Sequence, residues 1–87
     1  MYTLYVLQHT VSRKLYIGKT SNLQRRMRQH NKNQQTATRH KNGEWMLVYA
    51  EAYRVKADLD ARELKLKQHG SNLRWLKDRI KHSMLDG

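Results

Sequence analysis

The sequence predicts an α+β domain in which helices flank a small, mostly antiparallel three-stranded sheet, in the order β-β-α-β-α-α. Three observations predict it: two strand-like runs joined by a polar turn near the N-terminus, one strongly apolar run in the middle, and helical apolar spacing in most of the rest. With 87 residues and 38% hydrophobic content, the chain can form one small core. We therefore expect a single domain over residues 1–87.

The first two strands are expected at residues 2–7 and 14–18. Every residue of the first run, YTLYVL, favours strands, and the alternation places Tyr2, Leu4 and Val6 on one face. The polar residues 8–13 form the turn between the strands. Gly18 is expected to end the second strand.

Two tyrosines of this hairpin are candidates for a common site. If the turn is symmetric about Thr10 and Val11, Tyr5 lies directly opposite Tyr16. Directly opposed residues share a face of the sheet. A slip of one residue would send the two rings to opposite faces, so the proximity of the rings depends on this register.

The run TSNLQRRMRQH predicts a helix with Thr20 or Ser21 as its N-cap. At 100° per residue, three side chains share the buried stripe of this helix: Leu23, Met27 and His30. From phase alone, His30 is either a hydrogen-bonded core histidine or part of a site.

The arginines of this helix have different expected orientations. Arg26 lies at the margin of the buried stripe, beside His30, whereas Arg25 and Arg28 point away from the core. Arg26 is therefore the candidate site residue, with an arginine that only covers apolar surface as the alternative. We expect Arg25 to attract phosphate groups from the exposed face.

The remaining elements follow in order along the chain. Residues 32–44 are polar and aperiodic, which predicts a loop, and residues 45–53 form the third and most apolar strand. A second helix covers residues 56–68, with Gly70 as the residue after its C-cap. Ser71 then caps a final helix, whose apolar stripe contains Leu73, Leu76, Ile80 and Met84.

Glu63 interrupts an apolar row of the second helix. One stripe of that helix contains Ala57, Ala61 and Leu64, and the other contains Leu59, Glu63 and Leu66. A partly buried carboxylate needs a cationic partner. The sequence leaves two partners open, an arginine at the edge of the core or a divalent metal ion.

Composition limits the classes of function. The net charge of +11, from 18 Lys and Arg against 7 Asp and Glu, favours a polyanionic partner. The absence of cysteine excludes disulfides and thiol catalysis, and the scattered histidines do not favour a zinc site. No apolar run is long enough for a membrane span or a signal peptide, so we expect a cytoplasmic protein, nucleoid-associated in a prokaryote. We also expect a monomer or a weak dimer. A protein that binds anionic membranes is a weaker alternative.

The ordered set of Tyr5, YIG at 16–18, NLQRRMRQHN at 22–31, WMLVYAE at 45–51 and Glu63 resembles the GIY-YIG nuclease family, particularly its small single-domain members. The resemblance runs from Tyr2 to about Lys67. The second half-motif matches letter for letter, whereas the first retains only the tyrosine, in Thr3-Leu4-Tyr5.

The resemblance implies a catalytic set consisting of Tyr5, Tyr16, Arg26, His30 and Glu63. Glu63 would hold Mg²⁺, with Mn²⁺ as a substitute, and Arg26 would bind phosphate oxygens. The two tyrosines would position or deprotonate the attacking water, with Lys14 as a nearby positive charge. Which tyrosine is the base stays open. The family asparagine has no secure equivalent, since Asn72 and Asp78 are both candidates.

The resemblance thus implies a metal-dependent DNA endonuclease of low sequence specificity or with a preference for a DNA structure, in DNA repair and recombination or in a mobile-element or defence context. The basic residues expected to contact nucleic acid are Lys14, Lys19, Arg25, Arg28, Arg39 and His40. A protein partner for targeting is possible, and the sequence does not distinguish DNA from RNA. The alternative is a module of the same fold that binds nucleic acid without cutting it.

Overall fold

The computed structural model describes residues 1–33, 38–68 and 70–85, and gives the backbone alone for residues 70–73. The predicted order β-β-α-β-α-α is confirmed. The elements are β1 (Tyr2–His9), β2 (Leu15–Thr20), α1 (Leu23–Asn31), β3 (Trp45–Tyr53), α2 (Lys56–Gln68) and α3 (Gly70–Arg79). The bounds of β3 and α2 coincide with the predicted ones.

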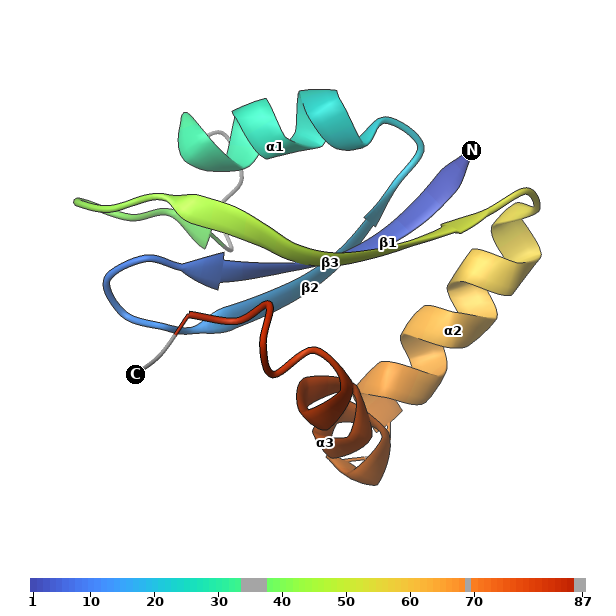
Figure 1. The fold of residues 1–87 in the computed structure, drawn as a ribbon. Helices are drawn as coiled ribbons and strands as arrows, with labels where there is room; N and C mark the ends of the chain where they lie inside the picture. Colours follow the sequence, from blue (N-terminus) through green and yellow to red (C-terminus); the bar gives the residue numbers. More distant parts are fainter. Residues whose placement is uncertain (34–37, 69, 86–87) are drawn as a thin grey trace.

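The three strands form one antiparallel sheet in the order β2-β1-β3, so the first strand is central and β2 is an edge strand. Helix α1 covers one face of this sheet, and α2 and α3 cover the other face (Figure 1). We call these the α1 face and the α2 face. The predicted flanked three-stranded sheet is confirmed.

Each face has its own apolar cluster because successive residues of β1 point to opposite sides. On the α2 face the buried cluster consists of Leu4, Val6, Val48, Leu59, Leu66, Leu76 and Ile80. On the α1 face it consists of Tyr5, Leu7 and Trp45, packed against Tyr16, Leu23 and Met27. The predicted stripe of α1 is therefore confirmed, and the two candidate tyrosines belong to the smaller cluster.

The predicted register of the hairpin is wrong, but both tyrosines still share a face. Tyr5 lies opposite Gly18, and Tyr16 lies opposite Leu7. The turn is centred one residue later than expected because β1 continues to His9, whose Nδ1 accepts hydrogen bonds from two backbone amides of the turn. The partner of Tyr5 therefore moves by two residues along β2, and an even shift keeps both rings on the same face.

The start of α1 also differs from the prediction. The N-cap is Asn22, whose side chain accepts a hydrogen bond from Arg25 N at 3.1 Å, rather than Thr20 or Ser21. Strand β2 runs through Gly18 to Thr20, so Gly18 does not end the strand. Of three consecutive residues able to cap a helix, the last does so, because the strand extends further than expected.

The predicted C-terminal features are partly wrong. Gly70 is the first residue of α3 rather than the residue after the cap of α2, and α3 ends at Arg79 before a series of turns. The side chains of Ser71 and Leu73 lie outside the described residues. Leu76 and Ile80 are buried as predicted, and Met84 packs partly against them.

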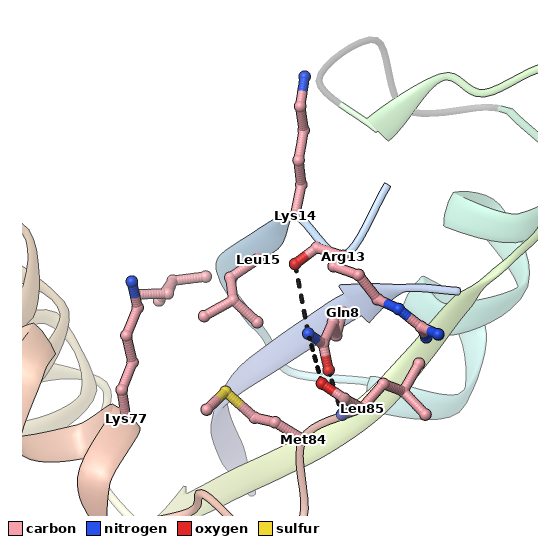
Figure 2. A pocket seen from close by; sticks show the side chains of 8 residues that line it. Gln8, Arg13, Lys14, Leu15, Lys77, Met84 and Leu85 are labelled. Atoms are coloured by element: carbon pink, nitrogen blue, oxygen red, sulfur yellow. Dashed lines mark hydrogen bonds between the residues drawn. The ribbon is translucent and has the colours of Figure 1, made fainter. Parts of the chain in front are cut away.

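The segment after α3 returns to the sheet through one buried glutamine. The side chain of Gln8 donates hydrogen bonds to the carbonyls of Arg13 and Leu85 and accepts one from Leu85 N (Figure 2). The adjoining cavity, of about 550 Å³, is lined by apolar side chains such as Leu15 and Met84 and by basic ones such as Lys77. This cavity belongs to the α2 face and is lined by none of the candidate catalytic residues.

Helix α2 is tied to β3 by a partly buried ion pair. Arg62 donates to both carboxylate oxygens of Glu51, at 3.0 to 3.1 Å. The hydroxyls of Tyr49 and Tyr53 donate to the same carboxylate. Leu64 is 55% exposed, so the row with Leu59, Glu63 and Leu66 is the one that faces the sheet.

Candidate active site

A buried chain of hydrogen bonds lies beneath α1. Tyr5 and His30 are both fully buried, and Tyr5 Oη lies 2.8 Å from His30 Nε2. His30 Nδ1 lies 2.6 Å from Thr38 Oγ1. The indole of Trp45 donates to the Thr38 carbonyl at 2.8 Å, which secures the end of the chain. His30 is thus hydrogen-bonded at both ring nitrogens. Sequence reasoning missed Thr38, which lies in an aperiodic polar segment.

The protonation states of this chain follow from its burial. Burial and the neighbouring Tyr16 raise the pKa of Tyr5 to about 12, against the opposing charge of Arg26. Burial and the Arg26 charge lower the pKa of His30. At neutral pH Tyr5 is therefore a protonated phenol beside a neutral His30. In the tautomer in which Tyr5 donates to Nε2, the ring proton is on Nδ1 and is donated to Thr38.

Tyr16 is the accessible tyrosine of the pair. It is half-buried, and its ring centroid lies 6.3 Å from that of Tyr5 and 5.1 Å from that of His30. Gly18 makes this packing possible, because a Cβ there would lie 2.4 Å from Tyr5 Oη and 2.8 Å from Tyr16 Cε2. The glycine of the YIG run is therefore required for close approach of the two rings.

The arginines of α1 lie as the helical phase predicts. Arg26 is half-buried, and its charge acts on both Tyr5 and His30. Arg25 and Arg28 are exposed. A hollow of about 180 Å³ at the start of α1 is lined by Thr20, Ser21, Asn22, Arg25, Arg26 and Gln29. The guanidinium groups at this hollow suit the binding of an anion such as a phosphate.

Glu63 lies on the α2 face, apart from the tyrosines. Its side chain is 18% exposed and pairs with Lys19 at 3.3 Å and with Lys67 at 3.4 Å. Lys19 belongs to the α2 face because it lies opposite Leu4 in the sheet. Within the described residues, Arg26 is not an ion-pair partner of Glu63. The cation that Glu63 requires is thus supplied by lysines.

Arg26 of the α1 face and two residues of the α2 face, Lys19 and Asp60, line neighbouring hollows at the end of the edge strand. Thr20 and Ser21 line the hollow that contains Arg26. They also line a second hollow, of about 210 Å³, that contains Lys19 and Asp60. Because no strand within the described ranges pairs with the outer side of β2, a ligand at this edge could contact residues from both faces.

Comparison with known families decides between the classes of protein considered so far. The sequence model of the GIY-YIG catalytic domain matches residues 1–77. The chain belongs to the GIY-YIG family. Members of this family are nucleases that act on DNA and generally use a divalent metal ion. Searches of curated proteins and of solved structures found no match.

The donors available for such an ion are carboxylates of α2. Asp60 Oδ1 lies 2.8 Å from Lys19 Nζ, and Glu63 Oε1 lies 3.3 Å from the same atom. No group of three or more His, Asp or Glu residues suited to a metal occurs in the described ranges. Two carboxylates one helical turn apart that already share one cation fit a hard ion such as Mg²⁺, which keeps several waters.

The charge of this GIY-YIG domain is unevenly distributed along the chain. Residues 1–43 contain nine Lys and Arg and no Asp or Glu, whereas residues 44–87 contain nine Lys and Arg and all seven Asp and Glu. The first half thus carries +9 and the second +2. The ion pairs of the described residues all use carboxylates of β3 and α2. This asymmetry was visible in the sequence, and it makes the α1 face the more electropositive surface.

The residues predicted to contact nucleic acid divide between the two faces. Lys14, Arg39 and His40 line a cleft beside Tyr16 on the α1 face. Lys19 lies on the α2 face, where it pairs with Asp60 and Glu63, and its contact with nucleic acid stays a prediction. The side chain of Asn72 lies outside the described residues, and Asp78 is exposed on α3. None of the helices in the described ranges is long and apolar enough to cross a membrane.

Proposed function

We propose that this protein is a divalent-metal-dependent endonuclease that hydrolyses DNA phosphodiester bonds with little sequence specificity or with a preference for a DNA structure. The observation that carries the proposal is the buried chain from Tyr5 through His30 to Thr38, which lies beside the accessible Tyr16 and under the charge of Arg26. This activity suits a role in DNA repair and recombination, in the spread of mobile elements, or in defence against them.

The burial of the two tyrosines supports different roles for them. Tyr5 is fully buried and its pKa is about 12, so it neither touches the attacking water nor acts as a free base. Tyr16 is half-buried and lines an open cleft, so we assign the contact with the water to Tyr16. Tyr5 supports this arrangement from behind, since its ring packs against that of Tyr16 and its hydroxyl is held by His30 Nε2 at 2.8 Å.

Charge on the phosphate is neutralised from both sides of the β2 edge. Arg26 binds the non-bridging oxygens, where negative charge accumulates in the transition state. Glu63, with Asp60, would hold Mg²⁺ or Mn²⁺. When bound, the ion supplies further positive charge at the phosphate and at the leaving oxygen. Lys19 must then release the two carboxylates, since it now shares their oxygens.

One observation favours the alternative, a module that binds DNA without cutting it. Glu63 is paired with two lysines and is separated by the sheet from Tyr16. If these pairs persist when DNA is bound, no divalent ion is held and no bond is cut. The two functions differ in one measurable property, which is metal-dependent cleavage.

The test is a panel of labelled duplex, nicked, flap, junction, single-stranded and RNA substrates, incubated with Mg²⁺, Mn²⁺ or EDTA. We expect cleavage only with metal, and a loss of about 100-fold or more for Arg26→Ala. Arg25→Ala is the matched control, since it removes the same charge from the exposed side of α1, and we expect a loss below about tenfold. Binding without cleavage of any substrate would favour the alternative, and equal effects of the two variants would contradict the role of Arg26.

A further inference from the structure

The cleft beside Tyr16 on the α1 face, in which Tyr16 is expected to contact the water, extends as far as the hairpin turn. Its volume is about 340 Å³, much more than the roughly 30 Å³ of one water. The hairpin turn and residues 39–45 form its walls, and the residues that line it are His9, Ser12, Lys14, Leu15, Tyr16, Arg39, His40, Lys41, Asn42 and Trp45. Because Tyr16 lines this cleft, a nucleic-acid strand that passes over Tyr16 would enter the cleft.

His9 has a buried hydrogen-bond donor without a partner. The residue is 5% exposed, and its Nδ1 accepts from the amides of Val11 and Ser12 at 3.2 and 3.1 Å. The proton of the neutral ring is therefore on Nε2. His9 Nε2 has no hydrogen-bond partner among the described residues. Buried donors are nearly always paired, so an unpaired one in a cleft points to a ligand that accepts from it.

The cations around this ring favour an anionic ligand. Lys14, Arg39 and Lys41 are exposed, and within the described ranges none of them pairs with a carboxylate. Lys19, in contrast, is neutralised on the α2 face. Three uncompensated charges and a directed N–H donor match the chemistry of a phosphate group.

We propose that this cleft binds a backbone phosphate of the nucleic-acid strand next to the scissile one. His9 Nε2–H donates to an oxygen of that phosphate, and Lys14, Arg39 and Lys41 neutralise its charge. His40 packs edge to face on His9 and is half-buried, whereas Trp45, the other ring on His9, is buried. Of the two rings on His9, that of His40 is therefore the more accessible to a ligand in the cleft. This inference rests on the proposed function, because it places the substrate of the same site.

The test uses His9→Asn, because the amide oxygen of asparagine can replace Nδ1 as the acceptor for the turn while the Nε2 donor is lost. Affinity is measured in EDTA for a short duplex and for a set in which single phosphates are replaced by neutral methylphosphonates. At one position, we expect the methylphosphonate to lower the DNA affinity of the wild type by about tenfold or more. The same replacement should have little further effect on the DNA affinity of the His9→Asn variant. His82→Asn, at an exposed histidine after α3, is the control.

Salt dependence separates the donor from the cations. Lys41→Gln should lower the slope of log affinity against log salt by about 0.9, whereas His9→Asn should leave that slope unchanged. Arg39 and Lys41 are exposed, so their variants keep the test valid if His9→Asn does not fold. They too should lose affinity at the same methylphosphonate position. A wild type that binds DNA but shows no position coupled to His9, Arg39 or Lys41 overturns the inference alone, whereas a wild type that binds no nucleic acid overturns the proposed function as well.

Discussion

Gly18→Ala should disturb both the stability and the activity of the protein, because the glycine leaves room for two aromatic rings. A Cβ at this position would lie 2.4 Å from Cζ and Oη of Tyr5 and 2.8 Å from Cε2 of Tyr16. Tyr5 is fully buried, and its Oη is hydrogen-bonded to His30 Nε2 at 2.8 Å, so its ring has no free space to move into. Such overpacking costs about 1–3 kcal/mol.

For a domain of this size, that loss corresponds to a fall in Tm of about 5–20 °C. Thermal unfolding followed by circular dichroism measures it. A displacement of the tyrosines of about 1 Å should also slow cleavage by about 100-fold. The matched control is Ala50→Ser, which adds one atom at the exposed neighbour of Tyr5 on β3 and should change stability by less than about 0.5 kcal/mol. If Gly18→Ala melts and cuts like the wild type, the packing argument is wrong.

Two further predictions concern the α2 face. Lys19→Ala should raise the affinity for Mn²⁺, because the lysine ammonium no longer competes for the carboxylates of Asp60 and Glu63. Titration calorimetry measures this affinity. A weaker affinity in the variant would mean that these carboxylates do not form the metal site. Glu51→Gln should lower the free energy of unfolding by about 1–3 kcal/mol at pH 7, because Arg62 loses its ion-pair partner. Burial alone would raise the pKa of Glu51, but hydrogen bonds from Arg62, Tyr53 and Tyr49 outweigh it and hold that pKa below its usual value. The stabilisation from this ion pair is therefore complete above the unfolded-state pKa of about 4.3, and it is lost as the pH falls through the lower folded-state pKa. In urea unfolding from pH 7 to pH 3, the free energy of unfolding should therefore fall less in the variant than in the wild type.

The fold could be predicted wherever a strong apolar pattern decides the structure. The third strand and the second helix have the predicted bounds, since the run at residues 45–53 and the row with Leu59 and Leu66 have no competing placement. The hairpin register could not be predicted, because it depends on a side chain, His9, that accepts hydrogen bonds from the turn. Two further errors, at the cap of α1 and the start of α3, each concern a choice among neighbouring residues of similar capping ability.

The candidate site was predictable to the extent that it depends on helical phase. The phase of α1 places His30 inside and Arg26 at the margin, as the structure does. The separation of Glu63 from the tyrosines depends on strand parity, since Tyr16 and Lys19 of β2 point to opposite faces. The sequence shows this alternation along β2, but it does not show which helix packs on which face of the sheet. Thr38 could not be found, because nothing in its local pattern marks it as buried.

The central claim is that residues of both faces act on one phosphodiester bond at the edge of β2. The most direct test is the conversion of supercoiled plasmid to open circles by the wild type, Tyr16→Phe and Glu63→Gln, with Mg²⁺ and with EDTA. We predict nicking by the wild type only with Mg²⁺, and a loss of about 100-fold or more in each variant, with folding retained. Nicking by the wild type in EDTA, or by either variant at the wild-type rate, would contradict the claim.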